Sequence, residues 1–82
     1  MEHKVLTKEE CAKLAEEIGN LRYDSLVDLL NLLEAKLRSD SDKDDSRGRH
    51  CLAQALNRSA SGIGIATVHI QKAWEISEPH MK

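Results

Sequence analysis

Acidic residues crowd the middle of this 82-residue chain, in the stretch SDSDKDDS. Asp40, Asp42 and Asp44 have the spacing of the first, third and fifth ligands of an EF-hand calcium loop. The pattern then fails, because the sixth position, which needs glycine, is Asp45, and the twelfth, which needs a bidentate glutamate, is Cys51. We therefore interpret the stretch as a solvated acidic loop rather than as a calcium site.

Candidate zinc ligands are also few in this sequence. His50, Cys51 and Cys11 are the only residues from which a zinc site could be imagined, and they form neither a C-x-x-C nor an H-x-x-x-H pattern. We expect Cys11 to pack as a reduced thiol on the buried face of a first helix. The sequence predicts neither a metal nor another cofactor.

The run Asp24-Ser25-Leu26 resembles the attachment motif of acyl carrier proteins, a family of similar chain length. That family has a long loop before the motif, whereas only five residues separate Ile18 from Asp24 here. The long helix expected at the end of this chain also has no place in the carrier fold. We therefore interpret Ser25 as a helix cap.

Two histidines, His50 and His69, are the acid–base candidates on ordered structure. No carboxylate lies at helical spacing to orient His69, and a nucleophile–base pair, a phosphate-binding glycine loop and facing carboxylates are all missing from the sequence. A lone histidine in such a position is usually a packing or interface residue. We expect a protein that is not an enzyme.

Three arginines, Arg47, Arg49 and Arg58, precede a stretch without charged residues and lie near the start of the expected last helix. The amide dipoles of a helix start also favour anions. In a symmetric oligomer each arginine would be repeated around an axis, which would concentrate positive charge in an anion-binding cleft. The alternative interpretation is that these arginines only balance the acidic residues 40–45.

Size and composition favour a single small helical domain, residues 1–82. The chain has one Trp, one Tyr and no Phe, and its Gly 4 and Pro 1 are too few for many short strands. Residues 1–45 carry 7 Lys/Arg and 12 Asp/Glu, hence −5, and residues 46–82 carry 5 and 2, hence +3. This positive half is a weak argument for nucleic acid binding. With no apolar leader and no membrane-length apolar run, we expect a cytoplasmic protein.

The expected elements are three helices and one loop. The run Thr7–Glu10 reads as a capping box and predicts a first helix over 7–18, with a glycine just beyond its end. Leucines at helical spacing predict a second helix over 21–38, followed by the acidic loop 39–46. A long third helix is expected over 47–77, with a possible bend at 62–64.

Glycines 62 and 64 and the β-branched residues around them leave a strand over residues 62–70 as a rival to the middle of the long helix. In the helical interpretation, the apolar and small residues at 52, 56, 59, 63, 66, 70 and 73 alternate steps of four and three, which is the repeat of a helix seam. The middle of this helix is apolar on more sides than two short helices can cover. We therefore expect an oligomeric helical bundle, a dimer or larger, with an interface made by Ser59, Gly62, Ile63, Ala66, Ile70 and Trp74.

The general plan resembles small all-helical phage proteins that sequester cyclic oligonucleotide signals in oligomeric assemblies. The resemblance covers size, helix order and the short run AxxHIQxA at residues 66–73, and no family residue is carried over from it. Our main prediction is a regulatory, adaptor or inhibitor protein that acts by helix-mediated binding to itself and to another protein. The alternative is an oligomeric binder of an anionic small molecule such as a signalling cyclic nucleotide.

Overall fold

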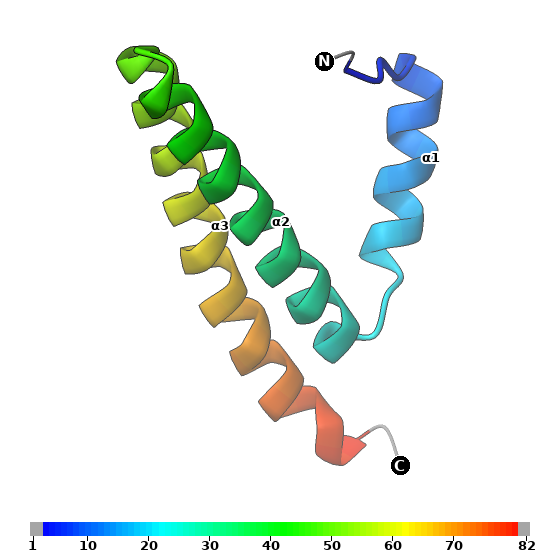
Figure 1. The fold of residues 1–82 in the computed structure, drawn as a ribbon. Coiled ribbons are helices and arrows are strands. Elements are labelled where there is room, and N and C mark those ends of the chain that lie inside the picture. The colour runs from blue at the N-terminus through cyan, green and yellow to red at the C-terminus, as the bar shows by residue number, and fades with distance from the viewer. Residues whose placement is uncertain (1–2, 81–82) are drawn as a thin grey trace.

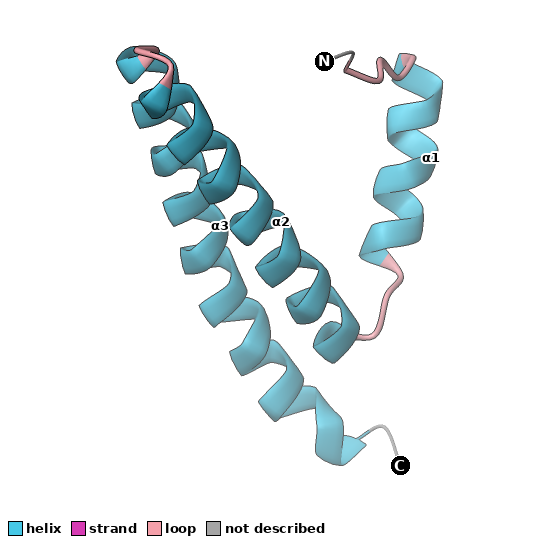
Figure 2. Cartoon of the chain, viewed as in Figure 1, coloured by secondary structure: helices cyan, strands magenta, loops and turns pink. Residues whose placement is uncertain are grey.

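A computed structural model describes residues 3–80 and contains three α-helices and a closing 3-10 turn. The helices are α1 (Lys8–Gly19), α2 (Tyr23–Ser46) and α3 (His50–Ser77), followed by η1 (Glu78–His80). Figures 1 and 2 show an all-helical chain, and no strand occurs within the described range. The predicted all-α class is confirmed. None of the described helices combines the length and apolar content needed to cross a bilayer.

Helix α1 begins as its capping box predicts. The Thr7 hydroxyl accepts from the Glu10 amide at 3.1 Å, and the Glu10 carboxylate accepts from the Thr7 amide at 3.1 Å. Gly19 is the last helical residue rather than the first one beyond the helix, because Asn20 supplies the cap and donates its amide to the Glu16 carbonyl. The predicted first helix is therefore correct to within one residue.

The predicted acidic loop is wrong, because residues 39–46 form the last two turns of α2. Lys36 Nζ lies 2.6 Å from both carboxylate oxygens of Asp40, one helical turn away. Ser41 is buried and its hydroxyl donates to the Ala53 carbonyl of α3 at 2.6 Å. These contacts within α2 and with α3 outweigh the low helix propensity of Ser and Asp, so α2 runs eight residues past its predicted end at residue 38.

The residue that ends α2 is a glycine, Gly48, which lies inside the range predicted for the third helix, 47–77. Gly48 has φ of +79°, its amide donates to the Asp45 carbonyl, and the Arg49 amide donates to the Asp44 carbonyl at 2.8 Å. This pair of bonds is a Schellman motif, which needs a left-handed residue at the position after the cap. The long helix therefore begins at His50 and not at Arg47 as predicted.

Helix α3 is one uninterrupted α-helix through both of its internal glycines, so the rival strand over residues 62–70 is wrong. A Cβ atom added to Gly64 would lie 3.0 Å from a carboxylate oxygen of Glu34 on α2. The end of the Glu34 side chain thus lies against Gly64. Gly62 has no such neighbour within 4 Å.

Helices α2 and α3 pack side by side, running in opposite directions, as a long hairpin (Figure 1). Three small residues of α3, seven positions apart, are buried against α2: Ala53 is 4% exposed, Ala60 0% and Thr67 8%. The next position at this spacing is the half-buried Trp74. Half-buried residues lie between them at positions 56, 63 and 70, so the steps of the seam alternate three and four. The predicted repeat is correct at 56, 63 and 70, but 52, 59 and 66 give way to their neighbours 53, 60 and 67.

Helix α1 stands apart from this hairpin (Figure 1). The described fold is extended, at 51 × 28 × 14 Å, and its radius of gyration of 15.4 Å exceeds the value of about 12 Å expected for a compact domain of this length. The accessible surface is 6613 Å², whereas a compact monomer of 9.2 kDa exposes about 4,900 Å². The chain thus leaves about 1,700 Å² more surface in water than a closed domain would.

The buried alanine of the seam provides a test of this packing. In Ala60→Leu the added carbons have no space between α2 and α3, so we expect a loss of about 1–3 kcal/mol in the free energy of unfolding. Urea unfolding followed by circular dichroism measures it. Ala35→Leu, the same change at an exposed site of α2, is the matched control. Equal midpoints for the two variants would contradict the close approach.

Candidate functional site

The structure divides the six predicted interface residues into two groups. Ile63, Ile70 and Trp74 are half-buried, and they lie on the side of α3 that faces α2. The remaining residues of the predicted set are exposed and lie along the flank and back of α3: Ser59, Gly62 and Ala66. The predicted set thus combines half-buried residues next to α2 with residues that are exposed.

One long side of the hairpin is apolar. On α2 it carries Leu29 and Leu33, which are 38% and 43% exposed, together with the half-buried Leu26 and Leu37. The spacing of these leucines places them on one flank of the α2 seam.

Helix α3 extends the same side of the hairpin. Ile63 and Ile70 lie at the edge of the seam, and Ala66 and Leu52 lie beside them, with Leu52 46% exposed. We call the eight residues the apolar face: Leu26, Leu29, Leu33, Leu37, Leu52, Ile63, Ala66 and Ile70. A surface of this kind and length on a small protein is typical of a binding site.

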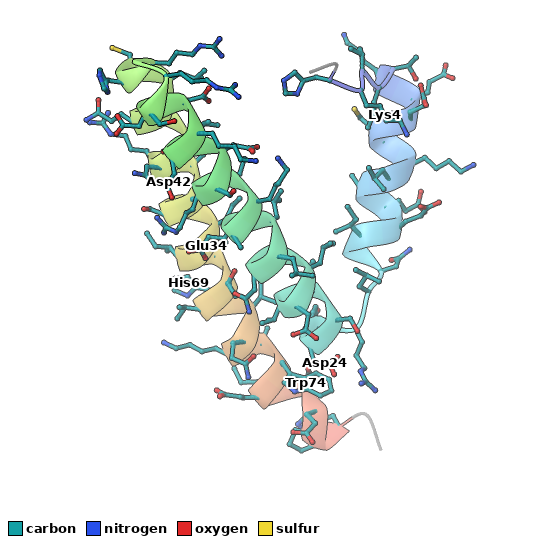
Figure 3. The ribbon with its side chains drawn as sticks, in the orientation of Figure 1. Lys4, Asp24, Glu34, Asp42, His69 and Trp74 are labelled. Carbon is teal, nitrogen blue, oxygen red and sulfur yellow. The ribbon has the colours of Figure 1, made fainter. Side chains whose placement is uncertain are left out.

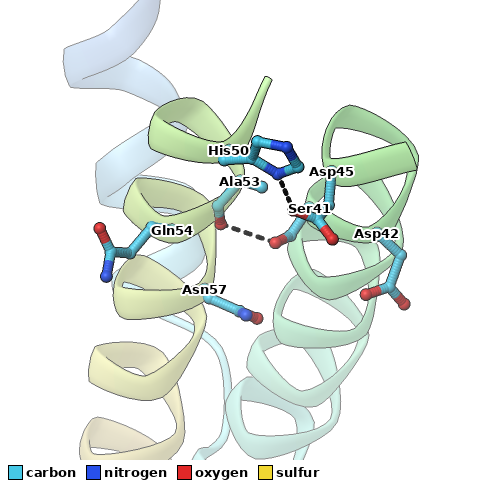
Figure 4. Close-up of a pocket in the computed structure, with 7 residues that line it drawn as sticks. All are labelled: Ser41, Asp42, Asp45, His50, Ala53, Gln54 and Asn57. Atoms are coloured by element: carbon cyan, nitrogen blue, oxygen red, sulfur yellow. Dashed lines mark hydrogen bonds and ion pairs between the residues drawn. The ribbon is translucent and has the colours of Figure 1, made fainter. Parts of the chain in front are cut away.

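The opposite side of the hairpin carries more polar residues, although Val68 there is largely exposed, and it has two shallow hollows, of which the second has a mostly apolar lining. The first encloses about 220 Å³ at the turn end of the hairpin (Figure 4), and its lining is mostly polar: Ser41, Asp42, Asp45, His50, Ala53, Gln54 and Asn57. The second encloses about 420 Å³ further along: Val27, Asn31, Thr67, Val68, Gln71, Lys72 and Glu75.

The first hollow contains a histidine–carboxylate pair without a nucleophile. His50 Nδ1 lies 2.5 Å from an Asp45 carboxylate oxygen, and both side chains are mostly exposed to water (Figure 4). The hydroxyl of Ser41 is buried and donates to the Ala53 carbonyl, so it is not available to be activated. The other candidate base, His69, is exposed on the outer side of α3 (Figure 3). Within residues 3–80 no three potential metal ligands come together.

The three predicted anion-binding arginines do not form one site within a chain. Arg49 is bound to Asp44 at 3.4 Å, next to the turn. Arg47 caps α2, and Arg58 lies on α3 about nine residues, or roughly 14 Å, beyond Arg49. Any shared anion site would therefore need arginines from several copies of the chain.

A cluster that the sequence did not suggest ties the α1–α2 connection to the end of α3. Arg22 makes two hydrogen bonds of 2.7 Å to the two carboxylate oxygens of Asp24. Its guanidinium group also lies over the Trp74 ring, 5.2 Å from the ring centre. Figure 3 shows Asp24 and Trp74 together at this end of the hairpin. We call Arg22, Asp24 and Trp74 the latch.

In the latch, the charge on Arg22 favours the ionised form of Asp24, and the charge on Asp24 favours the protonated form of Arg22. The hydrogen bond from Arg22 lowers the pKa of Asp24 below its ordinary value of 3.8, and the Asp24 carboxylate raises the pKa of Arg22. The only sequence signal for it was the two-residue spacing of opposite charges in RYD. The tryptophan lies 50 residues away in the chain, so no local pattern could have added it.

Comparison with protein-family models, with curated proteins and with solved structures gives no significant match to this chain.

Acid should open the latch. The folded-state pKa of Asp24 is lowered, so its contribution is complete above pH 3.8 and is lost as the pH falls through the lowered value. Trp74 is the only tryptophan, so we expect its fluorescence to report a transition below pH 3.8.

The matched variants assign that transition to one carboxylate. Asp24→Asn should remove it, because the variant has no carboxylate to titrate beside Arg22. Asp40→Asn should retain it: Lys36 lowers the pKa of Asp40 in the same direction, but Asp40 lies four turns further along α2. Identical acid titrations of the two variants would contradict the latch.

Proposed function

We propose that this chain is a small non-enzymatic regulatory or adaptor protein that acts through helix-mediated protein–protein binding, beginning with its own self-association. The surface excess of about 1,700 Å² over a compact monomer supports this proposal most directly. A standard protein–protein interface buries about 800 Å² on each partner. The excess is therefore large enough for self-association and for a further contact.

The chemical character of the surface supports the same proposal. The apolar face holds five leucines and two isoleucines, several of them more than a third exposed. The hollows on the polar side lack a positioned nucleophile, and the described part of the chain gathers no metal ligands. A surface of this composition is suited to bind another helix and offers little means to catalyse a reaction.

Self-association can be tested on α3, where the structure leaves room for substitutions. Neither Ala66 nor Gly62 is buried against α2, and nothing lies within 4 Å of a Cβ atom placed on Gly62. We expect light scattering to give the wild-type chain at least twice 9.2 kDa at micromolar concentration. Ala66→Glu and Gly62→Leu should shift that mass toward 9.2 kDa without loss of helicity.

Ser61→Glu is the matched control, because Ser61 is exposed on the polar side of the same helix and receives the same charge. Its mass should equal that of the wild-type chain. A wild-type chain of 9.2 kDa, or equal masses for the wild type, Ala66→Glu and Gly62→Leu, would contradict self-association through this part of α3.

A second proposal is capture of an anionic small molecule, such as a signalling cyclic nucleotide, by arginines of several copies. One observation favours it: the ion pairs found among residues 3–80 include neither Arg47 nor Arg58. In a panel of nucleotides we expect one to raise the melting temperature by several degrees, with the rise lost in Arg58→Ala and kept in Lys13→Ala. No response to any nucleotide would count against this second function and leave the first in place.

A further inference from the structure

Helix α1 has an apolar side that is largely exposed among residues 3–80. Cys11, Leu14 and Ala15 are exposed, Ile18 is half-buried, and their spacing places all four on one side of the helix. Isolated helices shorter than about 12–15 residues are marginal in water, and α1 has 12 residues. Its capping box helps, but a helix of this length normally depends on packing against another surface.

The connection to α2 is short, hydrogen-bonded and directed away from the hairpin. Only residues 20–22 separate α1 from α2, and the Leu21 amide donates to the Ile18 carbonyl at 3.1 Å. At the other end, Arg22 is held by Asp24 and Trp74, and its carbonyl accepts from the Leu26 amide at 3.0 Å. Because both ends are fixed, α1 diverges from its own α2 (Figure 1) and leaves its apolar side unpaired.

The apolar face of the hairpin has the dimensions that α1 requires. Its leucines run from Leu26 to Leu37, about 17 Å along α2, and α1 is about 18 Å long. Both surfaces consist mostly of aliphatic side chains, and both are partly exposed in the same chain. In a two-fold dimer the same contact forms twice, so each copy covers the apolar face of the other with its α1.

The excess surface of the chain is large enough for two α1 contacts in one dimer. A single standard interface removes about 800 Å² from each partner, and the excess surface of this chain is about twice that. Exchange of an identical element between two copies is a low-cost route to such a dimer, because it needs no surface beyond those already present.

We propose that the occupant of the apolar face is α1 of a second copy of this chain, and that two copies exchange their α1 helices reciprocally. This inference rests on the self-association proposed above and adds which surfaces meet. Leu14 of one copy then lies against the apolar face of the other, and the latch holds each α1 in the orientation that reaches across.

A mixing experiment tests the exchange. Leu14→Glu damages α1 and leaves the apolar face intact, whereas Leu33→Glu damages the apolar face and leaves α1 intact. Each variant alone has a charge in both contacts of its dimer, so we expect about 9 kDa by light scattering for each. In an equimolar mixture one of the two contacts is wild type on both sides, so species of about 18 kDa should reappear.

The controls separate folding from assembly. Ala12→Glu, with the same charge on the flank of α1, should retain the wild-type mass. Circular dichroism checks that each variant keeps its helices. If the glutamate variants lose helicity, Leu14→Ser and Leu33→Ser are mixed in the same way.

Three other outcomes would contradict the exchange, and the measured masses distinguish them. Closure of α1 onto its own hairpin gives a compact wild-type monomer, which removes the proposed self-association as well. Hairpins that meet directly give Leu14→Glu the wild-type mass. If both variants are monomeric and the mixture stays at about 9 kDa, self-association stands and the exchange fails.

Discussion

The close approach of α2 and α3 is the constraint on which the rest of this structure depends. Ala53, Ala60 and Thr67 recur every seven residues, and no long side chain holds the two helix axes apart at these positions. The approach is close enough for the Ser41 hydroxyl to donate to the backbone carbonyl of Ala53 at 2.6 Å. It also brings Glu34 against Gly64, where any larger residue would displace it. A tight seam of this kind produces a thin hairpin.

Two helices alone cannot bury the larger apolar side chains of the hairpin. Small residues fill the buried positions of the seam, so leucines and isoleucines lie at its edge and make one side of the molecule apolar. The same small residues that stabilise the hairpin thus create the surface on which we base the proposed self-association.

Charge has a supporting role at both ends of the hairpin. Near the turn, Asp44 and Asp45 lie at the C-terminal end of α2, where the helix dipole disfavours anions, and Arg49 and His50 lie next to them. At the other end, Arg22 links Asp24 to Trp74 and so joins the start of α2 to the end of α3. Because these groups are exposed, they contribute little to the free energy of unfolding, and their main effect is to orient the chain segments between the helices.

Local signals in the sequence determined the helices themselves. The Thr7–Glu10 capping box located the start of α1, and the alternating steps of four and three from residue 52 to residue 73 favoured a helix over a strand at residues 62–70. Gly48 carried a helix-end signal that the acidic composition of the preceding stretch obscured, so the end of α2 was misplaced although the information was present.

Only the tertiary structure decided which side of α3 meets α2. The set 52, 59, 66 and the set 53, 60, 67 have the same spacing, share the positions 56, 63 and 70, and each include at least two small residues. The choice between them depends on what α2 presents, here Ser41 and Glu34, and those contacts join residues that are far apart in the chain. The pattern of one helix specifies that it has a seam, but the surface of its neighbour selects the residues that fill it.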